Sequence, residues 1–88
     1  MDLDRAWELH PQVSVRPEPF GALLYHFGTR KLSFLKDPRL LEVLRGLSDA
    51  PTARAACLAA GVPEGEVRRF EIALESLEQS KMLVERPS

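Results

Sequence analysis

The hydrophobic pattern changes its period near Asp37, and this change limits the folds that the chain can adopt. Before Asp37, apolar and polar residues alternate along residues 13–16, and the aromatic-rich segment 21–35 has the pattern of a β-hairpin. After Asp37, apolar residues recur at helical spacing up to Lys81. A small sheet followed by helices predicts an α+β domain.

The register of the hairpin follows from a two-residue turn at Gly28-Thr29. The predicted cross-strand pairs are Phe27 with Arg30, Tyr25 with Leu32, and Leu23 with Phe34. One face of the hairpin is then almost wholly apolar, and we expect this face to be buried. The expected core therefore includes Phe20, Leu23, Tyr25, Phe27, Leu32 and Phe34. On the opposite, partly wet face we expect Leu24 beside Ser33 and an exposed pair of His26 with Lys31.

The flanking elements complete a three-stranded antiparallel sheet followed by three helices. A short edge strand is expected at residues 13–16, with Val13 and Val15 on its apolar face. Asp37 is a suitable cap for a helix at residues 38–47, and Gly61 is a suitable left-handed end for a helix at residues 52–60. The third helix is expected at residues 64–81, and residues 82–84 can form a last short strand.

Size and charge restrict the class of protein. The 88 residues suffice for one domain, residues 1–88, whose ends at about 1–6 and 85–88 we expect to be flexible. The formal net charge of -1 disfavours nucleic acid and anionic membranes as partners. The acidic start lacks a following apolar run and Cys57 is the only cysteine, which favours a soluble protein of the cytoplasm.

The sequence offers little catalytic chemistry. His10, His26 and Cys57 lack the short spacings of metal sites, and Cys57 lies among alanines, as a small buried hydrophobe does. No nucleophile–base pair or glycine-rich phosphate loop is present. We therefore expect a protein that is not an enzyme and needs no metal or cofactor.

A family resemblance extends these expectations. Residues 10–35 read HPQVSVRPEPFGALLYHFGTRKLSFL and closely resemble the mycofactocin precursor-peptide chaperones, a branch of the PqqD-like recognition elements. Residues 54–61 and the last helix also resemble this family, with lower specificity. The resemblance implies that the protein binds a short ribosomal precursor peptide ending in Val-Tyr and presents it to a radical S-adenosylmethionine (SAM) maturase. It also implies no bond chemistry by this chain.

The element order is that of a winged-helix-like domain, in which the strand at residues 31–36 has a free edge next to the third helix. A peptide can add to such an edge as a further strand. The strand would contribute Ser33 and Leu35, or Leu32 and Phe34 if the faces are reversed, and the helix has one flank with Glu71, Glu75 and Glu78 and another that carries Arg69. The candidate peptide-binding residues are Lys31, Leu32, Ser33, Phe34, Leu35, Lys36, Arg69, Ile72, Ala73 and Ser76.

Two further residues are candidate contacts for the partner enzyme. Ile72 lies opposite the apolar arc of its helix and is expected to be exposed, and Trp7 either caps the core or anchors a partner. The uncovered strand edge also allows a weak homodimer. The alternative functions are a winged-helix DNA-binding regulator, disfavoured by the glutamates of the third helix, and a non-catalytic subunit that only dimerises, or that stabilises an enzyme, through Trp7, Ile72 and the tail.

Overall fold

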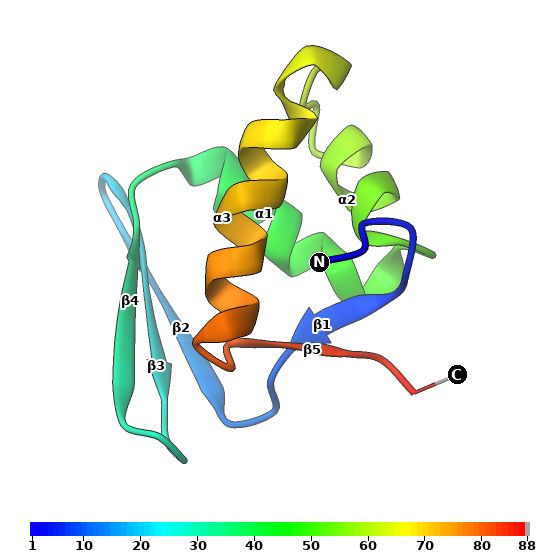
Figure 1. Cartoon of the computed structure of the whole chain (residues 1–88). Helices are drawn as coiled ribbons and strands as arrows, with labels where there is room; N and C mark the ends of the chain where they lie inside the picture. Colours follow the sequence, from blue (N-terminus) through cyan, green and yellow to red (C-terminus); the bar gives the residue numbers. More distant parts are fainter. Residues whose placement is uncertain (88) are drawn as a thin grey trace.

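The computed structural model describes residues 1–87, which form two antiparallel sheets and three α-helices (Figure 1). The elements in chain order are β1 (Trp7–Leu9), β2 (Val13–Glu18), β3 (Gly21–His26), β4 (Lys31–Leu35), α1 (Pro38–Gly46), the 3₁₀ turn η1 (Leu47–Asp49), α2 (Ala53–Ala59), the 3₁₀ turn η2 (Glu64–Glu66), α3 (Val67–Gln79) and β5 (Leu83–Glu85). The predicted α+β class, with a three-stranded antiparallel sheet and three helices, is confirmed. The winged-helix-like relationship stays a prediction.

The larger sheet has the strand order β2-β3-β4, so that β2 and β4 form its edges. Figure 1 shows α1 and α3 on one side of this sheet. No described element covers the other side. The sheet therefore has an inner face toward the helices and an outer face toward solvent.

The predicted register is right, but the predicted turn and the predicted core face are wrong. The ladder ends at His26 and Lys31, so that Phe27 and Arg30 belong to a four-residue turn and do not form the expected pair. Tyr25 pairs with Leu32 and Leu23 pairs with Phe34, as expected. The residues that face the helices are nevertheless Ala22 and Leu24 of β3 and Leu35 of β4, which are all buried. The aromatic residues expected in the core are instead exposed, with exposed fractions of 79% for Phe20, 61% for Phe27, 62% for Leu32 and 51% for Phe34. Leu23 and Tyr25 are half-buried.

The physical reason is that the helices pack on an aliphatic face. Val13 and Val15 pair with His26 and Leu24, and both valines pack against the core. Because strand side chains alternate between faces, this pairing places Leu24 inside and Tyr25 outside. The largest fully buried side chains are correspondingly aliphatic or sulfur-containing, namely Leu24, Val43, Leu47, Cys57, Leu74, Met82 and Leu83.

His26 organises the turn between β3 and β4, which corrects its predicted position as an exposed residue. Its exposed fraction is 3%, and its Nδ1 atom accepts hydrogen bonds from the amides of Gly28 at 3.0 Å and Thr29 at 3.1 Å. The imidazole also lies 4.4 Å from the ring of His10, centroid to centroid. The amide of Arg30 donates to the His26 carbonyl at 2.7 Å, and Arg30 adopts a left-handed φ of 61°. The histidine thus satisfies two backbone donors that the turn leaves unpaired.

The capping signals of the first two helices are confirmed, whereas the third helix is shorter than the predicted 64–81, because residues 64–66 form the 3₁₀ turn η2 and α3 ends at Gln79. The Asp37 carboxylate accepts a hydrogen bond from the Arg39 amide at 2.9 Å and caps α1. Helix α2 ends in a Schellman motif in which the amides of Gly61 and Val62 reach the carbonyls of Leu58 and Cys57.

Helix α3 ends in the same motif as α2, with a lysine where α2 has glycine. The amides of Lys81 and Met82 donate to the carbonyls of Glu78 and Leu77. Lys81 has a left-handed φ of 63°, against 85° for Gly61. The side chain of Lys81 is exposed, so the left-handed backbone is held without a packing contact in the core.

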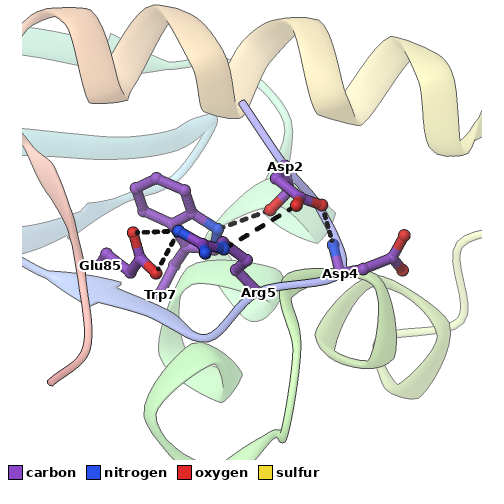
Figure 2. A network of polar contacts seen from close by, with 5 residues as sticks. All are labelled: Asp2, Asp4, Arg5, Trp7 and Glu85. Atoms are coloured by element: carbon purple, nitrogen blue, oxygen red, sulfur yellow. Dashed lines mark hydrogen bonds and ion pairs between the residues drawn. The ribbon is translucent and has the colours of Figure 1, made fainter. Parts of the chain in front are cut away.

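The smaller sheet ties the two ends of the chain together, and its strand β1 is absent from the predicted elements. β1 pairs with β5, which matches the expected last strand. Trp7 has an exposed fraction of only 6%, and its indole N–H donates to the Asp2 carbonyl at 2.8 Å (Figure 2). Trp7 therefore caps the core, one of the two roles that the sequence left open.

The first residues, expected to be a flexible end, pack onto the rest of the protein. Leu3 is buried and its carbonyl accepts from the Arg54 amide at 2.9 Å. Arg5 forms an ion pair with Glu85 at 3.0 Å, drawn in Figure 2. The flexible end expected at residues 85–88 includes Ser88, which lies outside the described residues.

Both Schellman ends favour glycine at the residue with a left-handed backbone. Replacing Lys81 by glycine removes the steric cost of a left-handed backbone, so Lys81→Gly should raise the free energy of unfolding by about 0.5–1 kcal/mol. Gly61→Ala should lower it by about 1 kcal/mol, because an added Cβ at Gly61 meets no atom within 4 Å and only the backbone strain remains. Urea denaturation of both variants measures these changes. A destabilised Lys81→Gly protein would contradict the strain argument.

Substitution of Gly21, at the start of β3, should lower the free energy of unfolding by more than substitution of Gly61. A Cβ at Gly21 would lie 1.7 Å from the Leu35 carbonyl oxygen, and its φ is 152°. Gly21→Ala must therefore displace β4, and we expect a loss of at least about 2 kcal/mol in unfolding free energy. Gly46→Ala is the matched control, because a Cβ at Gly46 meets nothing within 4 Å and alanine favours the helix. Equal stabilities of the two variants in urea would show that the clash at Leu35 is relieved cheaply.

Candidate functional site

The outer edge of β4 presents backbone groups that no described strand pairs with. The amide of Phe27 donates to Gln12 on the β2 side, and the carbonyl of His26 accepts from Arg30 on the β4 side. Because antiparallel strands alternate these directions residue by residue, Lys31, Ser33 and Leu35 direct their amides and carbonyls to β3. The amides and carbonyls of Leu32 and Phe34 therefore point outward at the free edge.

A groove of about 360 Å³ lies between this edge and α3. Its base includes the buried side chains of Leu35, Leu40 and Leu77. The complete lining comprises Ser33, Phe34, Leu35, Lys36, Asp37, Leu40, Ala73, Ser76 and Leu77. The groove thus combines free backbone groups on one side with apolar side chains at its base.

Six of the ten predicted peptide-binding residues line this groove. They are Ser33, Phe34, Leu35, Lys36, Ala73 and Ser76. Both alternatives for the strand wall are represented, since Ser33 and Leu35 belong to the inner face and Phe34 to the outer face of the sheet. The helix presents to the groove the flank with Ala73 and Ser76, not the flank with Glu71, Glu75 and Glu78.

Arg69 lies beside the groove, in a smaller adjoining hollow. This hollow of about 80 Å³ is lined by Asp37, Leu40, Arg69, Phe70 and Ala73, three of which also line the groove. The guanidinium of Arg69 lies 2.8 Å from Glu66 and 3.8 Å from Asp37. Arg69 therefore lies between the start of α3 and the start of α1, at one end of the groove.

The other predicted residues occupy different surroundings. Lys31 and Leu32 are exposed at the beginning of β4, and neither lines the groove. Ile72 is exposed, as predicted, and also lies outside the groove lining. Trp7 belongs to the core.

Three groove residues were missed by the sequence analysis. Asp37 was predicted only as a helix cap, and Leu40 and Leu77 belong to the apolar residues that recur at helical spacing after Asp37. The short link from β4 to α1 could have indicated Asp37 and Leu40. A helix that starts so soon after an edge strand must place its first turn at that edge.

A third hollow of about 550 Å³ lies at the start of α1 and is lined mainly by charged side chains. Its charged members are Asp37, Arg39, Glu42 and Arg69. No strand residue contributes to it, so it offers no free backbone edge. We therefore take the groove beside β4 as the candidate site.

Reactive groups are scarce in the described part of the chain. Cys57 is fully buried, and burial raises the pKa of its thiol, which opposes formation of the nucleophilic thiolate. Within residues 1–87, no three His, Cys, Asp or Glu side chains are grouped as a metal site requires. None of the helices described is long and apolar enough to cross a membrane.

Comparisons with known proteins point to one family. The family model for the "Peptide chaperone MftB family" matches residues 6–84. A protein named Peptide chaperone MftB from Mycobacterium ulcerans is 61% identical over 83 residues, which cover 94% of this chain and 76% of the relative. The proteins of the same name from Mycobacterium tuberculosis and Mycolicibacterium smegmatis are each 59% identical, covering 97% and 94% of this chain and 78% and 81% of the relatives. No solved structure matches the chain significantly.

Two substitutions of Asp37 should separate the contributions of its capping oxygen and of its charge to the free energy of unfolding. Asp37→Ala removes the acceptor of the Arg39 amide and should lower the unfolding free energy by about 1 kcal/mol. Asp37→Asn keeps a capping oxygen and loses only the charge near Arg69, so its cost should stay within a few tenths of a kcal/mol. Urea denaturation measures both changes. Equal losses would assign the effect to the ion pair and not to the cap.

Proposed function

This chain belongs to the Peptide chaperone MftB family, and from this premise we propose that it binds the mycofactocin precursor peptide as an added strand on β4 and delivers it to a radical SAM maturase. The observation that carries this proposal is the free edge of β4 beside the groove. The chain itself acts as a non-catalytic accessory protein, a chaperone within a winged-helix-like fold.

Backbone pairing would supply affinity that does not depend on the peptide's side chains. The outward amides and carbonyls of Leu32 and Phe34 are arranged as an antiparallel or parallel partner strand requires. A peptide in an extended conformation can satisfy them without any rearrangement of β4. Each such hydrogen bond typically contributes about 0.5–1.5 kcal/mol.

Side-chain contacts in the groove would supply specificity. A peptide strand on β4 directs every second side chain toward the helices, where Leu35, Leu40 and Leu77 form an apolar base. Lys36 and Arg69 lie at the margin, where charged groups remain solvated. The site therefore favours a peptide with alternating apolar side chains. The family resemblance further implies that the precursor ends in Val-Tyr and that the enzyme would modify this end.

The DNA-binding alternative is disfavoured by the charge on α3. A recognition helix must approach phosphates, and α3 with its preceding turn η2 carries Glu64, Glu66, Glu71, Glu75 and Glu78. Two of its basic residues are already engaged, since Arg68 pairs with Glu71 at 2.7 Å and Arg69 with Glu66 at 2.8 Å. The remaining alternative, a non-catalytic subunit that dimerises or stabilises an enzyme, does not account for the groove with an apolar base beside the strand edge.

Strand addition predicts that binding depends on the amide of Phe34. Phe34→Pro removes an outward N–H, whereas Phe34→Ala removes the side chain and keeps the amide, so the proline variant should bind the synthetic precursor peptide about threefold to tenfold more weakly than the alanine variant. Isothermal titration calorimetry measures both affinities, and circular dichroism verifies that both variants are folded. Ser33 is unsuitable for this test because its amide faces β3.

A second measurement tests the same pairing from the side of the peptide. Single N-methylation along the precursor should weaken binding at every second position of the paired segment, because only alternate amides bond to β4. Uniform effects along the peptide, or no effect of Phe34→Pro beyond that of Phe34→Ala, would contradict strand addition. Failure of the unmodified peptide to bind at tens of micromolar would contradict the chaperone function at this site.

A further inference from the structure

The outer face of the large sheet carries a continuous apolar surface. We define the outer face by Leu23 and Tyr25 of β3, Phe27 of the turn, and Leu32 and Phe34 of β4. Leu23 pairs with Phe34 and Tyr25 pairs with Leu32, while the rings of Tyr25 and Phe27 meet edge to face at 5.0 Å. Phe27, Leu32 and Phe34 are each more than half exposed. A contiguous apolar surface of this kind marks an interaction site on a soluble protein.

The sheet is also the basic part of an otherwise acidic chain. Residues 13–36 contain four basic and one acidic side chain, a net charge of +3, whereas the whole chain has a net charge of -1. Arg16 lies opposite Leu23 on β2, and its guanidinium is exposed although it pairs with Glu18 at 3.2 Å. Arg30 and Lys36 lie at the two ends of β4 and are exposed. The outer face therefore has an apolar centre and a margin with three basic residues, Arg16, Arg30 and Lys36, and one acidic residue, Glu18. Lys31 pairs with the buried His26 and belongs to the inner face.

The outer face is continuous with the edge at which the peptide is proposed to add. Side chains of Leu32 and Phe34 belong to the outer face, and Phe34 also lines the groove. A peptide strand on β4 would place every second side chain next to these two residues, on the same side of the sheet. A protein bound to the outer face would then contact the chaperone and the peptide together.

We propose that the outer face is the docking surface for the partner enzyme, through a patch of that enzyme with an apolar centre and an acidic margin. This inference rests on the proposed function. Aromatic and aliphatic side chains that are exposed in the free chaperone would form the buried centre of the interface, and the arginines and lysines its rim. The complementary charge would accelerate association.

Two other occupants are less suited to this surface. A second copy would bring two faces of the same positive charge together, and antiparallel pairing of two β4 edges about Ser33 would place Arg30 opposite Lys36. An anionic membrane surface attracts segments with clusters of four to eight Lys or Arg residues, more than the outer face presents.

The test is a variant that changes the outer face and spares the groove. Leu23→Thr, Tyr25→Thr and Phe27→Ser together remove the apolar centre, keep β-forming residues in β3, and alter no residue that lines the groove. Leu58→Ser is the matched control, because Leu58 is an exposed apolar residue on α2 in the helical part of the protein. Surface plasmon resonance with the purified partner enzyme and peptide-saturated chaperone measures docking, and calorimetry with the peptide alone measures loading.

We expect the triple variant to bind the enzyme at least tenfold more weakly and the peptide within twofold of the original chain, with no change for Leu58→Ser. Arg16→Glu, a single exposed substitution that leaves the core intact, should slow association several-fold and weaken its salt dependence. The proposal would be overturned if the folded triple variant bound the enzyme with unchanged affinity, or if Arg16→Glu left the association rate unchanged.

The remaining outcomes separate this inference from the proposed function. If the peptide does not bind but the enzyme still requires the outer face, the docking surface stands and the chaperone function fails. If sedimentation shows a dimer, or if vesicles containing phosphatidylserine bind the original chain, and the triple variant abolishes that binding, the outer face has a different occupant and the proposal is wrong.

Discussion

Burial of one face of the central strand β3 determines the arrangement of the rest of the protein. Ala22 and Leu24 are fully buried beneath the helices, and the buried His26 closes the turn that follows. Because a strand alternates its side chains, burial of these residues directs Leu23 and Tyr25 outward. The same alternation, carried across the ladder to β4, sets which amides face the free edge and which residues face solvent. The aliphatic inner face and the aromatic outer face of the sheet both follow from the burial of Ala22 and Leu24 beneath the helices.

The candidate groove depends on how closely α1 follows β4. Only Lys36 and Asp37 separate the strand from the helix, and the Asp37 carboxylate ends the extended segment by capping α1. This short link brings Leu40 to the base of the groove, while α3 supplies Ala73 and Leu77 from the other side. The edge of β4 is consequently neither covered by a helix nor isolated from apolar side chains. A free edge in such surroundings suits an added peptide strand, and Lys31 and Lys36 near its ends oppose pairing with another copy.

Much of the local structure could be predicted from particular residues. Asp37 and Gly61 set helix boundaries because a capping carboxylate and a left-handed glycine act on their nearest backbone groups. The register of Tyr25 with Leu32 was also predicted correctly, although the turn spans residues 27–30 and not only Gly28 and Thr29. Strand β1 was missed because three residues carry no periodicity, and His26 was misplaced because its acceptor role depends on amides that only the folded turn brings to it.

The sequence by itself determined the α+β class, the pairing of the hairpin, the helix ends and the resemblance to precursor-peptide chaperones, since each depends on neighbours within a few residues or on the order of residues along the chain. Only the tertiary structure decided which face of the hairpin is buried. Both faces carry large apolar residues, so the hairpin alone has no preference strong enough to choose. The choice comes from the packing of helices outside the hairpin, above all α1, against the face with Leu24 and Leu35, which leaves Tyr25, Phe27 and Phe34 on the other face.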